Sequence, residues 1–160
     1  MSGRWQLFGR RHRNVPLVRR PAPARGRVHT VTLANTPAAI ALSARTARTV
    51  FTSWGVPGRA STLDAVVLVV TELTVNAVRH ARSSHLALTF AMTDDHLDIS
   101  VHDEDPYLPA LARPRPGPRA GYGLAVIAEI AGDFGGHLSA GHDPGGNGKF
   151  VRVLLPCPRP

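Results

Sequence analysis

Apolar side chains recur at two spacings along the middle of the chain, and these spacings predict a helix followed by a hairpin. From Ser61 to about Ala81 the apolar residues recur every three or four positions, which is typical of a helix with one buried face. The start Ser61–Asp64 is similar to a capping box. Alternate residues are apolar from Leu86 to Met92 and from Leu97 to Val101, as in strands that bury one side. The polar turn at 93–95 joins these two strands.

The region before this helix predicts a short strand and a second long helix. His29–Leu33 is rich in residues that favour strands. Asn35 is a candidate N-cap and Pro37 suits the first helical position, so we expect a helix of about 18 residues that ends at Trp54. Gly55 follows directly and favours the end of a helix.

The region after the hairpin begins with a long loop. Five prolines between Glu104 and Ala120 exclude regular structure there, and loops of this length in a compact domain are often functional lids. A helix is predicted from Gly121 to Ala131, then a strand at His137–Ala140. A glycine-rich turn leads to a last strand at Phe150–Leu155.

The order of these elements predicts the fold class. Grouped helices and strands joined by hairpins favour an α/β (α+β) two-layer sandwich, with a mixed, mostly antiparallel sheet covered on one face by three main helices. The 160 residues, 43% of them hydrophobic, suit one domain. We expect a disordered arm rich in Arg and Pro at 1–27, a folded domain at 28–156 and a tail at 157–160.

The net charge of +8 comes from the predicted arm alone. The arm contains no acidic residue and eight arginines: Arg4, Arg10, Arg11, Arg13, Arg19, Arg20, Arg25 and Arg27. The remaining residues are balanced, with 11 basic and 11 acidic side chains. Nucleic-acid binding is therefore expected, if anywhere, in the arm. Arginine outnumbers lysine eighteen to one, which is typical of a GC-rich bacterial genome.

Cysteine usage and hydropathy favour a cytoplasmic location. Cys157 is the sole cysteine and cannot form an internal disulfide. The longest aliphatic run, Ala65–Val70, is much shorter than a membrane span, so no membrane association is expected, and no apolar segment of a signal peptide follows Arg11. Zinc binding is disfavoured because the eight histidines form no tight pair; His80 and His85 come closest.

Three groups of residues could carry chemistry. Glu72, Asn76 and His80 are spaced four apart and form one polar stripe on the second long helix, where they can hold a cation or meet phosphate. Alternatively, the stripe is simply the solvent-exposed side of an amphipathic helix and has no chemical role. Asp103 continues the inward-facing parity of the preceding strand, so its carboxylate needs a donor such as the amine of an adenine. An ordinary strand-end turn is the alternative.

The third group is the glycine pair Gly121 and Gly123 at the start of a predicted helix, which suits a phosphate. The dinucleotide fingerprint fails because Val126 replaces its third glycine. A Walker A loop also fails, because Asp143 stands at its first glycine and Phe150 at its Ser or Thr.

In this order the three groups resemble the GHKL ATPase family, which has the Bergerat fold. The run Glu72–Ala81 looks like its N box, Val101–Pro109 like its first glycine box, and Gly121–Leu124 like its second. The segment Asp133–Gly135 and the pair Gly148–Lys149 are similar to the anti-sigma-factor serine/threonine kinase branch. The resemblance covers about residues 28–155.

The resemblance implies a role for each matching residue. Asn76 would hold Mg²⁺ on the phosphates of ATP, Glu72 would be the catalytic base or position the nucleophile, and Asp103 would bind the adenine amine. The remaining nucleotide-binding positions would be Arg79, His80, Gly121, Tyr122, Gly123, Leu124 and Lys149. Lys149 is the sole lysine and either matches the family's Gly-Lys or is a surface turn residue.

The chain departs from the fuller family motif at three positions. Asp105 and Tyr107 stand where other members have glycines, and Phe150 stands where many have a Thr beside the adenine.

The resemblance thus implies a cytoplasmic regulator that binds ATP and Mg²⁺, phosphorylates a Ser or Thr of an antagonist protein, and sequesters a sigma factor or similar partner. It also suggests a homodimer. The alternative is a catalytically inactive nucleotide-binding module that switches partners through its lid. Glu72 favours the kinase, whereas the three departures favour the module.

Overall fold

Five antiparallel strands form one sheet in the order β1-β2-β3-β5-β4. The computed structural model describes residues 26–56, 60–109, 123–145 and 147–157. The strands are β1 (Arg27–Ala34), β2 (His85–Met92), β3 (His96–Asp103), β4 (His137–His142) and β5 (Lys149–Pro156). Every ladder among them is antiparallel, whereas the sequence predicted a mixed sheet that is mostly antiparallel.

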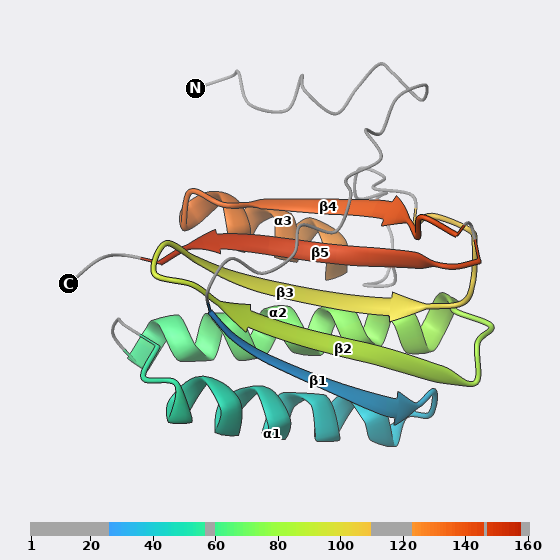
Figure 1. Cartoon of the computed structure of the whole chain (residues 1–160), viewed down its shortest axis with the longest axis horizontal. Coiled ribbons are helices and arrows are strands. Elements are labelled where there is room, and N and C mark those ends of the chain that lie inside the picture. Colours follow the sequence, from blue (N-terminus) through green and yellow to red (C-terminus); the bar gives the residue numbers. More distant parts are fainter. Residues whose placement is uncertain (1–25, 57–59, 110–122, 146, 158–160) are drawn as a thin grey trace, which may run out of the picture.

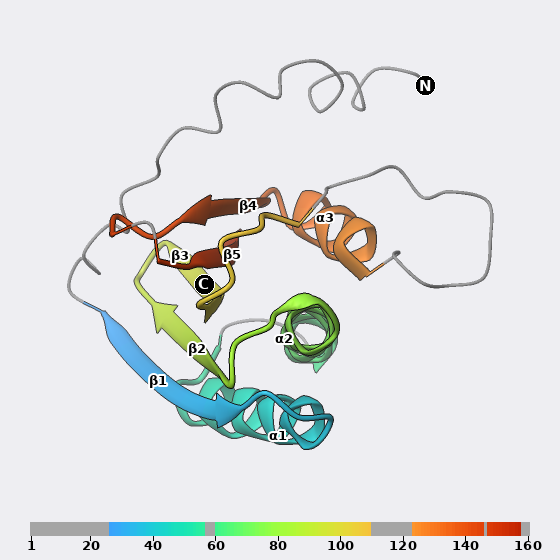
Figure 2. The ribbon, with the colours of Figure 1, turned by 90° about the vertical axis from the view of Figure 1, so that its right-hand side faces the viewer.

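Three helices cover one face of this sheet, as Figures 1 and 2 show. They are α1 (Ala38–Ser53), α2 (Ala60–His80) and α3 (Gly123–Asp133). The predicted two-layer α+β sandwich is therefore confirmed. Predicted and observed bounds differ by a few residues: β1 begins two residues early, α3 begins at Gly123, β4 extends into the glycine-rich turn, and β5 is one residue longer at each end.

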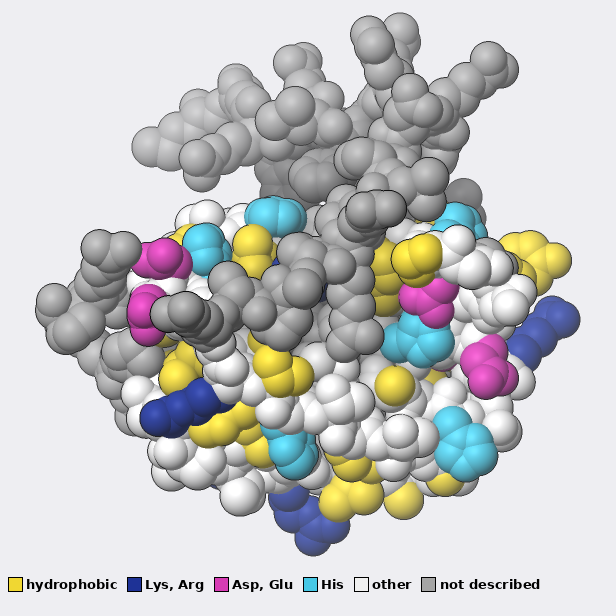
Figure 3. Space-filling view, viewed as in Figure 1, with side chains coloured by type: hydrophobic (Ala, Val, Ile, Leu, Met, Phe, Trp, Pro, Cys, Tyr) yellow, Lys and Arg dark blue, Asp and Glu magenta, His cyan; other side chains and the backbone are white. Residues whose placement is uncertain are grey.

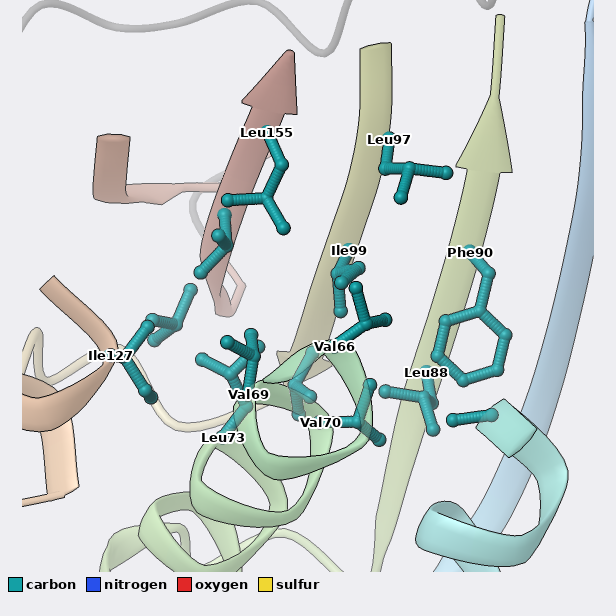
Figure 4. Packing of buried hydrophobic residues seen from close by; sticks show 14 of the residues in the cluster. Val66, Val69, Val70, Leu73, Leu88, Phe90, Leu97, Ile99, Ile127 and Leu155 are labelled. Carbon is teal, nitrogen blue, oxygen red and sulfur yellow. The ribbon is translucent and has the colours of Figure 1, made fainter. Parts of the chain in front are cut away.

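The core lies between the sheet and α2, the central helix. Alternate residues of β2, β3 and β5 point toward α2, and Figure 4 shows several of them meeting its valines. Val66, Val69 and Val70 of α2 are fully buried in this core. Because α1 and α3 flank α2, the helix is packed on its two sides as well as against the sheet.

The predicted N-cap of α1 has a different role. α1 is preceded by Pro37, which makes no capping bond through a side chain. The side chain of Asn35 instead donates to the carbonyl oxygens of Ala81 and Ser83, at 3.1 and 2.8 Å. Asn35 thus ties the β1–α1 connection to the end of α2, where helix carbonyls lack intrahelical donors.

The predicted capping box at the start of α2 is also wrong. α2 begins at Ala60, so Ser61 lies within the helix. The carboxylate of Asp64 pairs with Arg48 of α1 at 3.0 Å, and both side chains are more than half exposed. Exposed ion pairs of this kind contribute little to stability, about 1 kcal/mol or less.

The other face of the sheet carries no helix in the ranges given above. Arg152 of β5 makes a two-pronged ion pair with Asp98 of β3, at 2.8 and 2.6 Å. The hydroxyls of Thr30 and Thr89 are 3.1 Å apart across β1 and β2. Figure 3, viewed from this side, shows charged, histidine, apolar and other polar side chains intermixed. This mixture agrees with a face that meets water.

No helix in the described part of the chain is both long and apolar enough to span a bilayer. The predicted arm up to residue 25, most of the proline-rich loop and residues 158–160 lie outside the described residues.

The burial of α2 generates a stability prediction. Leu73 is 1% exposed, whereas Leu68, on the same helix, is 42% exposed. We expect Leu73→Ala to lower the free energy of unfolding by about 2–5 kcal/mol, because it leaves a cavity in the core. The control Leu68→Ala should cost about 1 kcal/mol or less. Urea denaturation measures both, and equal losses would contradict the described packing.

Candidate nucleotide-binding site

A buried ion pair marks the edge of the sheet where β3 ends and β5 begins. Asp103 and Lys149 face each other in register, and Nζ of Lys149 lies 2.8 Å from Oδ1 of Asp103. Their side chains are 3% and 4% exposed. The inward direction predicted for Asp103 is observed, and its carboxylate has donors from within the chain: the ammonium of Lys149 and the backbone N–H of Asp105, at 2.9 Å.

Asp105 fastens the start of the proline-rich loop to the end of α2. One carboxylate oxygen accepts from the backbone N–H of Arg82 at 3.2 Å, and the other accepts from that of Tyr107 at 3.0 Å. The carbonyl oxygen of Asp105 accepts from Nζ of Lys149 at 3.1 Å. The loop thus leaves the sheet in a fixed direction.

The same contacts lower the pKa of Asp105. The backbone N–H of Tyr107 is the largest cause, since it stabilises the ionised carboxylate. Burial opposes it, and the N–H of Arg82 and the charges of Lys149 and Arg82 add to the lowering. Asp105 is therefore a carboxylate at neutral pH.

The middle of α2 meets the first residue of α3. A Cβ placed on Gly123 would lie 2.6 Å from Oε2 of Glu72, so the absence of a side chain lets the carboxylate approach the helix end. A negative charge at a helix N-terminus is favourable, because the first backbone N–H groups have no intrahelical acceptors. Two of the predicted site residues, distant in sequence, are thus in contact.

The other residues of the α2 stripe differ in exposure. Asn76 lies one turn after Glu72, and both are half-buried on the same side of the helix. Arg79 and His80 occupy the last turn and are exposed, and the positive charge of Arg79 suits a helix C-terminus. Glu72 and Asn76 are thus more enclosed than Arg79 and His80.

The structure distinguishes the two interpretations of Lys149, a match to the family's Gly-Lys or a surface turn residue. Lys149 is buried, so it is no surface turn residue. Phe150 lies on the opposite side of β5, against Gly141 of β4, and so cannot stand beside Asp103. Position 148, directly before Lys149, requires glycine, because a Cβ there would lie 2.5 Å from the carbonyl oxygen of Asp103.

The segment predicted to bind phosphate is described in part. Gly121 and Tyr122 lie outside the described residues. Leu124 is 8% exposed, and its side chain belongs to the hydrophobic core. Its predicted contribution through the backbone remains a prediction.

α2 runs from the Glu72–Gly123 contact to the group formed by Asp103, Asp105 and Lys149. Glu72 meets α3 in the middle of the helix, and Arg82, just after its end, binds Asp105. Glu72 lies eight residues before the end of α2, which is about 12 Å along a helix. An elongated ligand along this side of α2 would have the buried ion pair at one end and the start of α3 at the other.

Sequence reasoning missed the roles of Asp105 and Asn35. Asp105 was noted as a departure from glycine, yet its carboxylate forms an Asx-type turn with the N–H two residues later. The Asp-Pro pair at 105–106 is a turn signal that could have revealed this. No local signal could have revealed the contact of Asn35 with a segment 46 residues later.

Comparisons with known proteins identify the family of this chain. A family model described as a histidine kinase-like ATPase domain matches residues 36–153. This match spans well over half of the chain, so the protein belongs to the histidine kinase-like ATPase domain family. It therefore holds an ATP-binding domain of that type.

Two curated relatives come from Mycobacterium tuberculosis. Each is 35% identical over 109 residues, which are 61% of this chain: "Sensor histidine kinase component HK1" from strain H37Rv and "Probable sensor histidine kinase HK" from strain CDC 1551. The match covers 64% of the first relative and 28% of the second. The chain thus corresponds to a part of each.

Similar solved structures include full-length ShkA in complex with AMPPNP, at 22% identity and a TM-score of 0.49, covering 61% of this chain and 22% of that one. The histidine kinase domain of the Erythrobacter litoralis EL346 blue-light activated histidine kinase aligns at 22% identity and a TM-score of 0.44, covering 60% of this chain and 45% of that one.

The lowered pKa of Asp105 generates a pH prediction. Since the native pKa lies below the unfolded value of about 3.9, the carboxylate stabilises the fold fully above that value. This stabilisation is lost as the pH falls through the native pKa. We expect Asp105→Asn to destabilise the protein at pH 7, and the difference from wild type to shrink as the pH falls below about 4.

Urea denaturation between pH 7 and pH 3 measures this difference. Glu104→Gln is the matched control, because Glu104 is the exposed neighbour of Asp105. A difference between Asp105→Asn and wild type that stays constant over the whole range would contradict the described contacts.

Proposed function

We propose that this domain binds ATP with Mg²⁺ and transfers a phosphoryl group to a Ser or Thr of an antagonist protein. The observation that carries the proposal is the contact between the Glu72 carboxylate and the first residue of α3. A carboxylate beside a phosphate-binding helix end can orient the acceptor hydroxyl and take its proton. Phosphoryl transfer depends mainly on such positioning and on charge neutralisation.

The base of the nucleotide would lie at the sheet edge. The buried carboxylate of Asp103 can accept from the exocyclic amine of adenine, and a buried acceptor discriminates strongly against ligands that lack the donor. The fixed direction of the loop after Asp105 keeps this carboxylate in place.

The phosphates would lie toward α3. Free backbone N–H groups at its N-terminus favour anions, and Gly123 leaves room for close approach. Asn76 offers an amide oxygen one turn from Glu72, a hard ligand of the kind that suits Mg²⁺ shared with phosphates. The bound Mg²⁺ would neutralise phosphate charge, and Arg79 and His80 would line the polar side.

The phosphate acceptor would belong to a partner. The partners proposed from the resemblance are an antagonist protein and a sigma factor or similar regulator, bound by a single copy or a homodimer.

A second candidate is a catalytically inactive module that binds nucleotide and switches partners. The clamp made by Asp105 favours it, since an aspartate and an exposed Tyr107 replace the glycines that allow the loop to move closely over phosphate. The two candidates differ in whether phosphate leaves the nucleotide.

Phosphoryl transfer separates the candidates. We expect the purified protein, with γ-labelled ATP and Mg²⁺, to label an antagonist protein, and Glu72→Ala to lower the rate at least about 100-fold while ATP affinity is retained. Asn76→Ala should instead lower the ATP affinity that depends on Mg²⁺. A label stable to acid indicates Ser or Thr, and one lost in acid indicates His. ATP binding without any transfer would favour the inactive module.

The fit of Glu72 against α3 can be tested from the glycine side. In Gly123→Ala the new methyl group must displace the Glu72 carboxylate, so we expect transfer to fall at least about tenfold with a stability change of about 1 kcal/mol or less. Gly132→Ala, in the same helix with nothing within 4 Å of the new Cβ, should leave transfer unchanged. Equal rates in both variants would remove Glu72 from the proposed role.

A further inference from the structure

The ion pair between Asp103 and Lys149 is unusual for a strand end because both of its charged groups are buried. Both charged groups are almost fully withdrawn from water, and removing two charges from water costs several kcal/mol per ion even when they meet. Well-packed apolar residues would serve stability equally well at such a position. The pair therefore calls for a role beyond holding β3 to β5, which the backbone ladder already does.

The choice of lysine is specific to this position. Lys149 is the one lysine among 19 basic residues, the others all being arginine. An ammonium is compact and has three donors, whereas the planar guanidinium of arginine presents five donors in a fixed fork. Of the three donors on Nζ, one is directed to Oδ1 of Asp103 and one to the carbonyl oxygen of Asp105. These two bonds hold the ammonium beside the carboxylate.

We propose that Lys149 is a second base-binding residue, whose remaining N–H donates to the N1 ring nitrogen of adenine while Asp103 accepts from the exocyclic amine. This inference rests on the proposed nucleotide site at Asp103. Adenine presents a donor and an acceptor side by side on this edge of its ring, and the ion pair presents an acceptor and a donor side by side. A lone carboxylate would bind only half of that pattern.

The proposal also accounts for the position of the pair. The two residues lie at the end of β3 and the start of β5, on the helix-covered face and beside the loop that Asp105 fastens to α2. Arg152, three residues further along β5, makes its ion pair with Asp98 on the opposite face. The same two strands thus carry one ion pair on each face, and only the Asp103 pair lies on the side of the proposed site.

Competition against a fluorescent ATP analogue tests the proposal. The competitors are ATP, 1-deaza-ATP, which lacks the N1 acceptor, and 7-deaza-ATP, which retains it. We expect the full-length wild type to bind 1-deaza-ATP at least about tenfold more weakly than ATP, as a lost hydrogen bond to a charged donor implies. It should bind 7-deaza-ATP as well as ATP.

Variants assign this discrimination to the ammonium. Lys149→Met should bind ATP and 1-deaza-ATP with similar affinity, because the donor to N1 is absent. Arg152→Met is the matched control, and it should keep the wild-type preference. Should Lys149→Met fail to fold with Asp103 unpaired, the comparison of competitors on the wild type still decides the matter.

The outcomes separate this inference from the proposed function. Equal wild-type affinity for ATP and 1-deaza-ATP, with ATP binding still lost in Asp103→Ala, overturns the role of Lys149 and leaves the nucleotide site in place. Weaker binding of 7-deaza-ATP alone also overturns it, because the donor would then address another ring nitrogen. Absence of ATP binding to the wild type overturns the nucleotide site and this inference together.

Discussion

A sheet with one covered face is the constraint on which the rest of this structure depends. Each strand must direct its apolar residues to the same side, and a single helix, α2, fills the space above the centre of that side. The flanking helices α1 and α3 then bury the sides of α2. Glu72 and Asn76 lie on a part of α2 that this packing leaves half-buried.

The same constraint explains why charged groups gather at the ends of the elements. At the edge where β3 ends and β5 begins, the inward-facing positions are occupied by charged residues, Asp103 and Lys149, in place of apolar ones. Their charges are compensated by each other and by the backbone of Asp105. An ionic group inside a fold persists when its partners are also inside.

Asp105 shows how a departure from a family motif can have a structural reason. In place of a glycine it supplies a carboxylate that joins the end of α2 to the start of the loop. The described start of the loop thereby leaves the sheet in a fixed direction. Asn35 has a similar effect on the other side, since it joins the start of α1 to the same helix end. The C-terminal end of α2 is therefore held by two separate segments.

The sequence by itself determined the elements, their order and the inward face of the strands, because these follow from the spacing of apolar residues. It also selected Glu72, Asn76 and Asp103 as candidates, since their spacing and parity are local properties. Only the tertiary structure decided that Lys149 is buried against Asp103 and that Phe150 faces away. It alone placed Glu72 against Gly123 and Asn35 against the end of α2. Those contacts join residues about 46 to 51 positions apart, and no local pattern specifies which distant partner a side chain will meet.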